Sequence, residues 1–172
     1  MIANQKSSDN HQPEKTLFEE KVREWWNSLK EKHRGERAEL RRCRSLTAAI
    51  FTPGYHRLRR KLAGTKWNND KKLVTVAMVL AHVKEDTGLK FVDSMAQPKE
   101  IGSDTPKVSG LRFRRLLKCN SHEELCIHLI RIVHLLKNVH ITDLAKDVYW
   151  WNDNKIRQDW AFKYYEKAPS AD

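Results

Sequence analysis

Arginine and lysine residues without acidic neighbours are the side chains in this sequence most able to do chemistry. Residues 30–61 contain eleven Lys or Arg but only three Glu, and residues 107–122 contain five Lys or Arg and no acidic residue. Arginine outnumbers lysine in both clusters, and its planar guanidinium binds phosphate through paired hydrogen bonds and stacks on bases. The two clusters therefore predict contacts with the backbone of a nucleic acid.

The second cluster has a helical arrangement that supports this interpretation. In a helix over residues 111–118, Phe113 and Leu116 face the core, and the basic residues form a stripe without acidic partners four positions away. A charge run is usually only a solvated face, but two unbalanced clusters in a chain of net charge +11 favour binding. The candidate contact residues in the two clusters are Arg41, Arg42, Arg44, Arg112, Arg114, Arg115 and Lys118.

These residues predict binding without sequence readout. The chain has no zinc-finger spacing, no basic region followed by heptads and no RNP-type motif. Phosphate contacts position a protein but carry no sequence information. Tryptophans could add stacking on unpaired bases. The Trp25–Trp26 and Trp150–Trp151 pairs are expected in the core, while Trp67, in a short polar loop, fits either role.

Metal binding and catalysis are not predicted. Cys119, His122, Cys126 and His128 could bind a metal, but structural zinc sites usually contain a close pair of cysteines, which this chain lacks. We expect two buried thiols and surface imidazoles instead. No Ser/His/Asp order, nucleophile elbow, P-loop or pair of carboxylates is present, so we expect no cofactor and no enzymatic activity.

Composition indicates a folded cytoplasmic protein. Of its 172 residues, 40% are hydrophobic, which is too many for a disordered polycation. The longest apolar run, residues 73–81, is less than half of the roughly 20 residues that span a bilayer, and the N-terminus has no apolar signal region. Three cysteines without framework spacing favour a reducing compartment over secretion.

The periodicity predicts an all-α fold of two linked helical bundles with about eight to nine helices and no strands. We expect a disordered tail over 1–15, an N-terminal bundle over 16–86, a linker over 87–107 and a C-terminal bundle over 108–168. The linker holds at most a short helix around Phe91–Ala96. A helix over residues 71–83, apolar nearly all round, is expected at the centre of its bundle.

Several helix ends are marked by local signals. Thr16 with Glu19, and Ser121 with Glu124, have capping-box spacing, and Gly35 indicates a break. Further starts are expected at Thr52–Pro53, Asn69, Ser109 and Asn152 or Asp153, with an end at Gly64.

Four segments resemble the small subunit of the type I-E CRISPR Cascade complex, the CasB family. They are GERAELRRCRS, FTPGYHRL, SGLRFRRLLKCNSHEELCIHLIRIVHLLK and DLAKDVYWWNDNKIRQDWAFKYY, and the likeness extends from about residue 18 to 165. Arg41 and Arg42 match the basic pair of the family, and Arg112 matches another basic position. Lys71, followed here by Lys72, matches the residue that opens the central helix, and these two lysines complete the set of nine candidate contact residues. Asn152 and Asp153 depart from the family, some members of which have basic residues there.

The resemblance implies a function in antiviral defence. It implies a non-catalytic, sequence-independent subunit that stabilises the R-loop by holding the displaced DNA strand and the guide–target backbone. The implied partners are crRNA, single-stranded DNA, a second copy of the chain, and the backbone-forming and large Cascade subunits, with no membrane. Two alternatives remain open: an assembly subunit that binds mainly other proteins, and a metal-independent helical ribonuclease.

Overall fold

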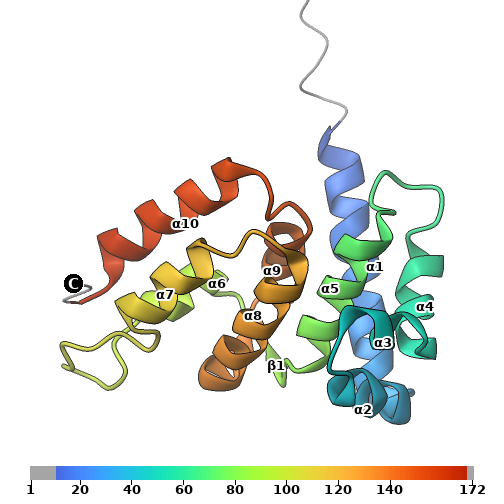
Figure 1. Cartoon of the computed structure of the whole chain (residues 1–172), viewed down its shortest axis with the longest axis horizontal. Helices are drawn as coiled ribbons and strands as arrows, with labels where there is room; N and C mark the ends of the chain where they lie inside the picture. Colours follow the sequence, from blue (N-terminus) through green and yellow to red (C-terminus); the bar gives the residue numbers. More distant parts are fainter. Residues whose placement is uncertain (1–10, 170–172) are drawn as a thin grey trace, which may run out of the picture.

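The computed structural model describes residues 11–169. Within them the fold has ten helices and two strands of two residues each (Figure 1), which confirms the all-α class with slightly more helices than predicted. The helices are α1 (His11–Glu31), α2 (Arg34–Arg42), α3 (Leu46–Ile50), α4 (Pro53–Lys61), α5 (Asp70–Ala81), α6 (Phe91–Ala96), α7 (Gly110–Leu117), α8 (His122–Leu136), α9 (Ile141–Tyr149) and α10 (Asn154–Lys167). The strands are β1 (Glu85–Asp86) and β2 (Asn138–Val139).

The first helix begins earlier than its capping pattern predicts. α1 starts at His11, so Thr16 lies inside the helix and is not its N-cap. Pro13 is in the first turn, where the missing N–H of proline costs no helical hydrogen bond. Residues 11–15 of the predicted tail are therefore helical, while residues 1–10 lie outside the described part of the chain.

The next two turns also differ from prediction. The break after α1 falls at Lys32 and His33, and Gly35 lies in the first turn of α2. α3 has no predicted counterpart, because five residues are too few to show a helical period. Its start is fixed by Ser45, whose Oγ accepts a hydrogen bond from the N–H of Ala48 at 3.1 Å.

α5 is buried among the helices of its own half, as predicted, and it also lies against the second half. Each of its residues from Leu73 to Ala81 is buried, and its N-cap is Asn69, whose side chain accepts a hydrogen bond from the N–H of Lys72. α2, α3 and α4 pack on it from the first half of the chain, and α8 and α9 from the second. The buried helix thus joins the two halves, whose apolar side chains form one hydrophobic core.

Residues 84–107 do more than link the halves. They contain β1, which pairs in parallel with β2, although no strand was expected. Two-residue strands have no alternation that a sequence pattern could show. The segment also contains the expected short helix α6, which packs against α10, and a loop closed by a bridge between Pro98 and Pro106.

The C-terminal helices begin at the predicted caps and are joined by aromatic contacts. The side chains of Ser109, Ser121 and Asp153 accept hydrogen bonds at the starts of α7, α8 and α10. Trp151 and Trp160 are buried with their rings 5.1 Å apart. Ser109 and Ser121 therefore fix where α7 and α8 begin, and with that the faces on which their arginines lie.

Candidate nucleic-acid interface

The predicted contact residues lie at the surface, and most have no acidic partner. Eight of the nine are exposed and Lys72 is half-buried. Among residues 11–169, Lys71 is the one member of the set that forms an ion pair, with Glu123 at 3.0 Å. The ammonium group of Lys72 lies 4.5 Å from the ring centre of Trp150. The other seven keep their charges free of carboxylates within this part of the chain.

The basic stripe of α7 forms one wall of a pocket of about 380 Å³. We call it the α7–α8 pocket. Arg112 and Arg115 line it from α7, and α8 contributes Arg131, His128 and His134. The α8 residues are three or six positions apart, which places them on neighbouring turns facing α7. The pocket thus presents three guanidinium groups and two imidazoles, a setting suited to phosphate oxygens.

A second cavity, of about 370 Å³, runs along the other side of α8. We call it the α8 groove. The turn between α2 and α3 forms one wall, with Arg44, and α8 forms the other, with Ile127 and Arg131. Met78 of α5 contributes to its lining. Because Arg131 lines both the groove and the α7–α8 pocket, the two cavities are neighbours on one basic face.

A pair of histidines adjoins the α7–α8 pocket, and the charge of Arg41 acts on one of them. The Nδ1 atom of His82 lies 2.9 Å from the Nε2 atom of His134, a residue of the α7–α8 pocket. Burial, with smaller contributions from the charges of His134, Arg41 and Arg37, lowers the pKa of His82 to about 4. The positive charges of the arginines therefore disfavour protonation of His82 at the buried contact between α5 and α8.

The structure brings some predicted residues together and separates others. Arg44, Arg112 and Arg115 line the two cavities, and the charge of Arg41 acts on His82, which contacts His134 of the α7–α8 pocket. The remaining predicted residues, Arg42, Lys71, Lys72, Arg114 and Lys118, line neither cavity. Sequence reasoning missed Arg131, His128 and His134, because the pattern of α8 draws attention to its apolar residues. The signal that could have identified this site is that Arg131 has no acidic residue four positions away in the sequence.

Other arginines of the first cluster have structural roles. Arg57 forms two hydrogen bonds with Glu36, at 2.7 and 3.0 Å, and this contact lowers the pKa of Glu36 below its ordinary value. Arg37 donates to the carbonyls of Ala81 and Val83 at the end of α5. The excess of basic residues over residues 30–61 therefore overstates the charge available for binding.

The aromatic side chains are mainly core. Trp67 is 5% exposed and stacks on Phe18 with ring centres 4.0 Å apart, so the core role is correct and base stacking is not. Trp25, Trp26 and Trp151 are buried as expected, whereas Trp150 is 38% exposed, against expectation. One face of Trp150 is already covered by Lys72.

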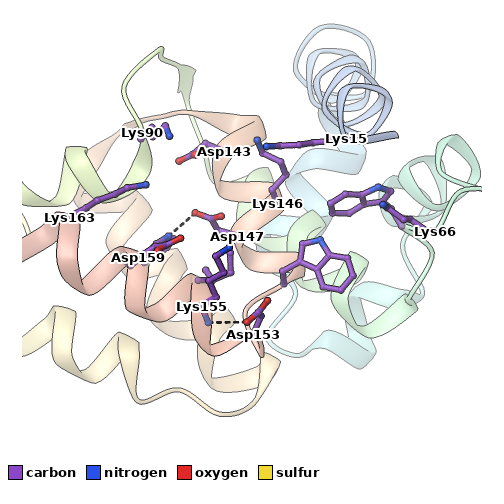
Figure 2. A pocket seen from close by; sticks show the side chains of 14 residues that line it. Lys15, Lys66, Lys90, Asp143, Lys146, Asp147, Asp153, Lys155, Asp159 and Lys163 are labelled. Carbon is purple, nitrogen blue, oxygen red and sulfur yellow. Dashed lines mark hydrogen bonds between the residues drawn. The ribbon is translucent and has the colours of Figure 1, made fainter. Parts of the chain in front are cut away.

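A cleft of about 700 Å³ has a lining that mixes lysines and aspartates (Figure 2). Lys146 pairs with Glu19 at 2.6 Å, and the indole N–H of Trp160 donates to Asp147 at 2.7 Å. Burial raises the pKa of Asp147 to about 6, with a smaller contribution from the charge of Asp143. Opposite charges offset one another here, so this cleft is a poorer phosphate site than the α7–α8 pocket.

Neither a metal site nor a membrane span is found in the described residues. Between residues 11 and 169, no group of three or more His, Cys, Asp or Glu side chains could hold a metal ion. Cys119 and Cys126 are buried, and burial raises the pKa of their thiols to about 11 and 12. His122 was expected at the surface but is 4% exposed. No helix in this part of the chain is long and apolar enough to span a bilayer.

Comparisons with known proteins agree with this fold. No curated protein is significantly similar to the chain in sequence. The structure is similar to a chain of the crystal structure of E. coli Cascade bound to a PAM-containing dsDNA target, with a TM-score of 0.65 and 15% identity. The match covers 85% of this chain and 95% of that chain. Residues 36–165 match the family of CRISPR-associated protein Cse2, also called CasB. The chain therefore belongs to the Cse2 family.

Proposed function

We propose that this chain is a non-catalytic, cytoplasmic subunit of a CRISPR Cascade complex that holds nucleic acid by its backbone. Membership of the Cse2 family and the similarity to a chain of E. coli Cascade support a role in such a complex. The basic face formed by the α7–α8 pocket and the α8 groove is the surface assigned to the nucleic acid. Its partners would be crRNA and the displaced DNA strand, beside a second copy of the chain and the backbone-forming and large subunits.

The observation that carries this proposal is that the arginines of the α7–α8 pocket have no carboxylate partners in the described part of the chain. Arg112, Arg115 and Arg131 converge on one pocket without an ion pair among residues 11–169. Bringing three guanidinium groups together is unfavourable unless water, salt or a bound anion screens their charges. A phosphate backbone supplies anions at regular spacing and releases its counterions when it binds.

Such a face would help to keep an R-loop open. The exchange of a DNA duplex for a guide–target hybrid is nearly balanced in free energy, so modest backbone contacts can decide its direction. A protein that holds the displaced strand by its phosphates hinders the return of that strand. Phosphate contacts do not depend on base identity, which suits a complex whose guide sequence changes.

Binding of the full chain to single-stranded DNA, measured against salt concentration, tests the proposal. Contact with about five phosphates predicts that a plot of log K against the logarithm of the salt concentration has a slope of about −3.5. Replacing Arg112, Arg115 and Arg131 by alanine should reduce the magnitude of the slope by about 2, because each lost contact removes about 0.7.

A matched control removes the same charge elsewhere. Lys15, Lys90 and Lys155 line the mixed cleft of Figure 2, and their replacement by alanine should leave the slope unchanged. A slope near zero for the original chain would overturn the proposal. Equal losses from the two triple variants would show that net charge, not the basic face, governs binding.

An assembly subunit that binds mainly proteins is the second candidate. Ile101, in the loop bridged by Pro98 and Pro106, is fully exposed, and Phe162 of α10 is 73% exposed. Exposed apolar side chains of this size are common at protein interfaces. If the chain enters a Cascade particle normally but binds no single-stranded DNA near physiological salt, this second function is the correct one.

A further inference from the structure

The α8 groove has an apolar character that phosphate binding alone does not require. Met78 in its lining is 3% exposed, and Ile127, in the middle of α8, is 51% exposed. Arg44 and Arg131 lie on opposite walls and have no carboxylate partner in the described part of the chain. A ligand that matches this surface has an apolar, planar part between two anionic groups.

We propose that the α8 groove receives one unstacked base of a bound single strand, with flanking phosphates held by Arg44 and Arg131. This inference rests on the proposed function, because it requires that the strand be bound at this face. It goes further by assigning a base-binding subsite with Ile127 at its wall. The cavity, about 370 Å³, lies within the range of about 300–1,000 Å³ usual for small-molecule sites.

Two polar side chains of the groove are already engaged, so we expect the site to show little preference among bases. The Oγ atom of Ser45 accepts the capping hydrogen bond of α3, and the thiol of Cys43 donates to the carbonyl of Glu39 at 3.3 Å. Guanidinium stacking and apolar contact do not depend on base identity, but they require a base that is unpaired. The groove therefore distinguishes single strands from duplexes rather than one sequence from another.

The acidic residue of the groove, Glu123, is placed so that it does not repel the phosphates held by the arginines. Glu123 belongs to the groove lining but is paired with Lys71 at 3.0 Å. Glu123 and Arg131 are eight residues apart on α8, or about two helical turns. The arginine end of the groove is thus the one that attracts the backbone.

Two oligomers with identical phosphates test this inference on the full chain. The first is a short oligothymidylate, and the second is an abasic oligomer of the same length. The chain should bind the oligothymidylate about tenfold more tightly, a difference of about 1.4 kcal/mol, because only this oligomer supplies a base to the groove. Ile127→Ser should remove most of that difference by weakening oligothymidylate binding alone, with no change in the salt slope.

The controls separate failure of the subsite from failure of the proposed function. Phe162→Ser removes another exposed apolar side chain, on α10, and should change neither affinity. Ile127 is half exposed, so far-UV circular dichroism should show unchanged helicity in its serine variant. Equal, salt-dependent binding of both oligomers would overturn the base site and leave phosphate binding intact. Loss of affinity for both oligomers in Ile127→Ser would also overturn it, and binding of neither oligomer by the original chain would overturn both proposals.

Discussion

The imidazole rings of His82 and His134 share a hydrogen bond of 2.9 Å that joins the central helix α5 to α8. His82 is 9% exposed, whereas His134 lies at the surface and lines the α7–α8 pocket. Arg37 and Arg41 add positive charge around the buried ring. The contact therefore links packing between the two halves of the chain to the charge of the basic face.

Acidification should destabilise the fold through His82. Burial and the nearby positive charges lower its pKa to about 4, while a histidine in the unfolded chain has a pKa of about 6.5. The unfolded state takes up the proton first, so the free energy of unfolding should fall by up to about 3 kcal/mol as pH decreases from about 6.5 to about 4. Urea denaturation measured across this range provides the check.

His82→Gln should flatten that part of the pH dependence. His128→Gln, on α8, is the matched control, because His128 has no hydrogen-bond partner among residues 11–169, and it should keep the original profile. An unchanged slope in His82→Gln would show that another group is responsible.

Titration of Asp147 should make the free energy of unfolding rise, rather than fall, as pH decreases. Burial, and then the charge of Asp143, raise its pKa to about 6, so the folded state keeps a proton that the unfolded state loses near about pH 4. The contribution of Asp147 to stability is complete below about pH 4 and is lost as pH rises towards about 6. Asp147→Asn keeps an acceptor for the indole of Trp160 and should stabilise the protein at neutral pH by about 2 kcal/mol.

The same substitution should have almost no effect at pH 4, where the carboxyl is already neutral. Asp159→Asn changes an exposed residue of the same cleft and should alter stability little at either pH. Thermal denaturation of the two variants at both pH values makes the comparison. A destabilised Asp147→Asn at neutral pH would mean that the charge itself is needed there.

Neighbouring arginines of α2 should respond differently to substitution. Charge reversal of Arg41 and Arg42 to glutamate should weaken binding to single-stranded DNA while leaving far-UV helicity intact, because both side chains are exposed. Arg37→Ala should instead lower the free energy of unfolding by about 2 kcal/mol, since it removes hydrogen bonds to the carbonyls of Ala81 and Val83. Urea denaturation and fluorescence anisotropy of each variant separate the two effects. Loss of helicity in the Arg41 and Arg42 variant would show that those side chains are structural.

Much of the fold could be predicted because its signals are local. The caps Thr52, Asn69, Ser109 and Ser121 each accept a hydrogen bond from the N–H group three residues ahead, so they can be read directly from the sequence. The burial of α5 follows from its composition. The predicted start of the first helix at Thr16 was wrong, because a capping pattern does not prevent a helix from beginning several residues earlier.

The candidate site was less predictable because its charge depends on tertiary contacts. Arg57 and Arg41 belong to the same basic cluster, yet Arg57 is paired with Glu36 from another helix and Arg41 is free of carboxylates among the described residues. Arg131 was missed since its importance comes from facing both α7 and the turn after α2. Only the packed helices show which arginines converge.

The burial of α5 between both halves has a consequence for how members of the family can recombine. A chimaera that joins the first half of this chain to the second half of a distant relative would place foreign side chains against α5, which packs on α8 and α9. Misfits in such a core cost about 1–3 kcal/mol each. Exchanges that keep α5 and the helices packed on it (α2, α3, α4, α8 and α9) from one parent avoid these misfits, so grafting of new surfaces onto this subunit is best confined to exposed positions of α7, α10 and the loop over residues 97–107.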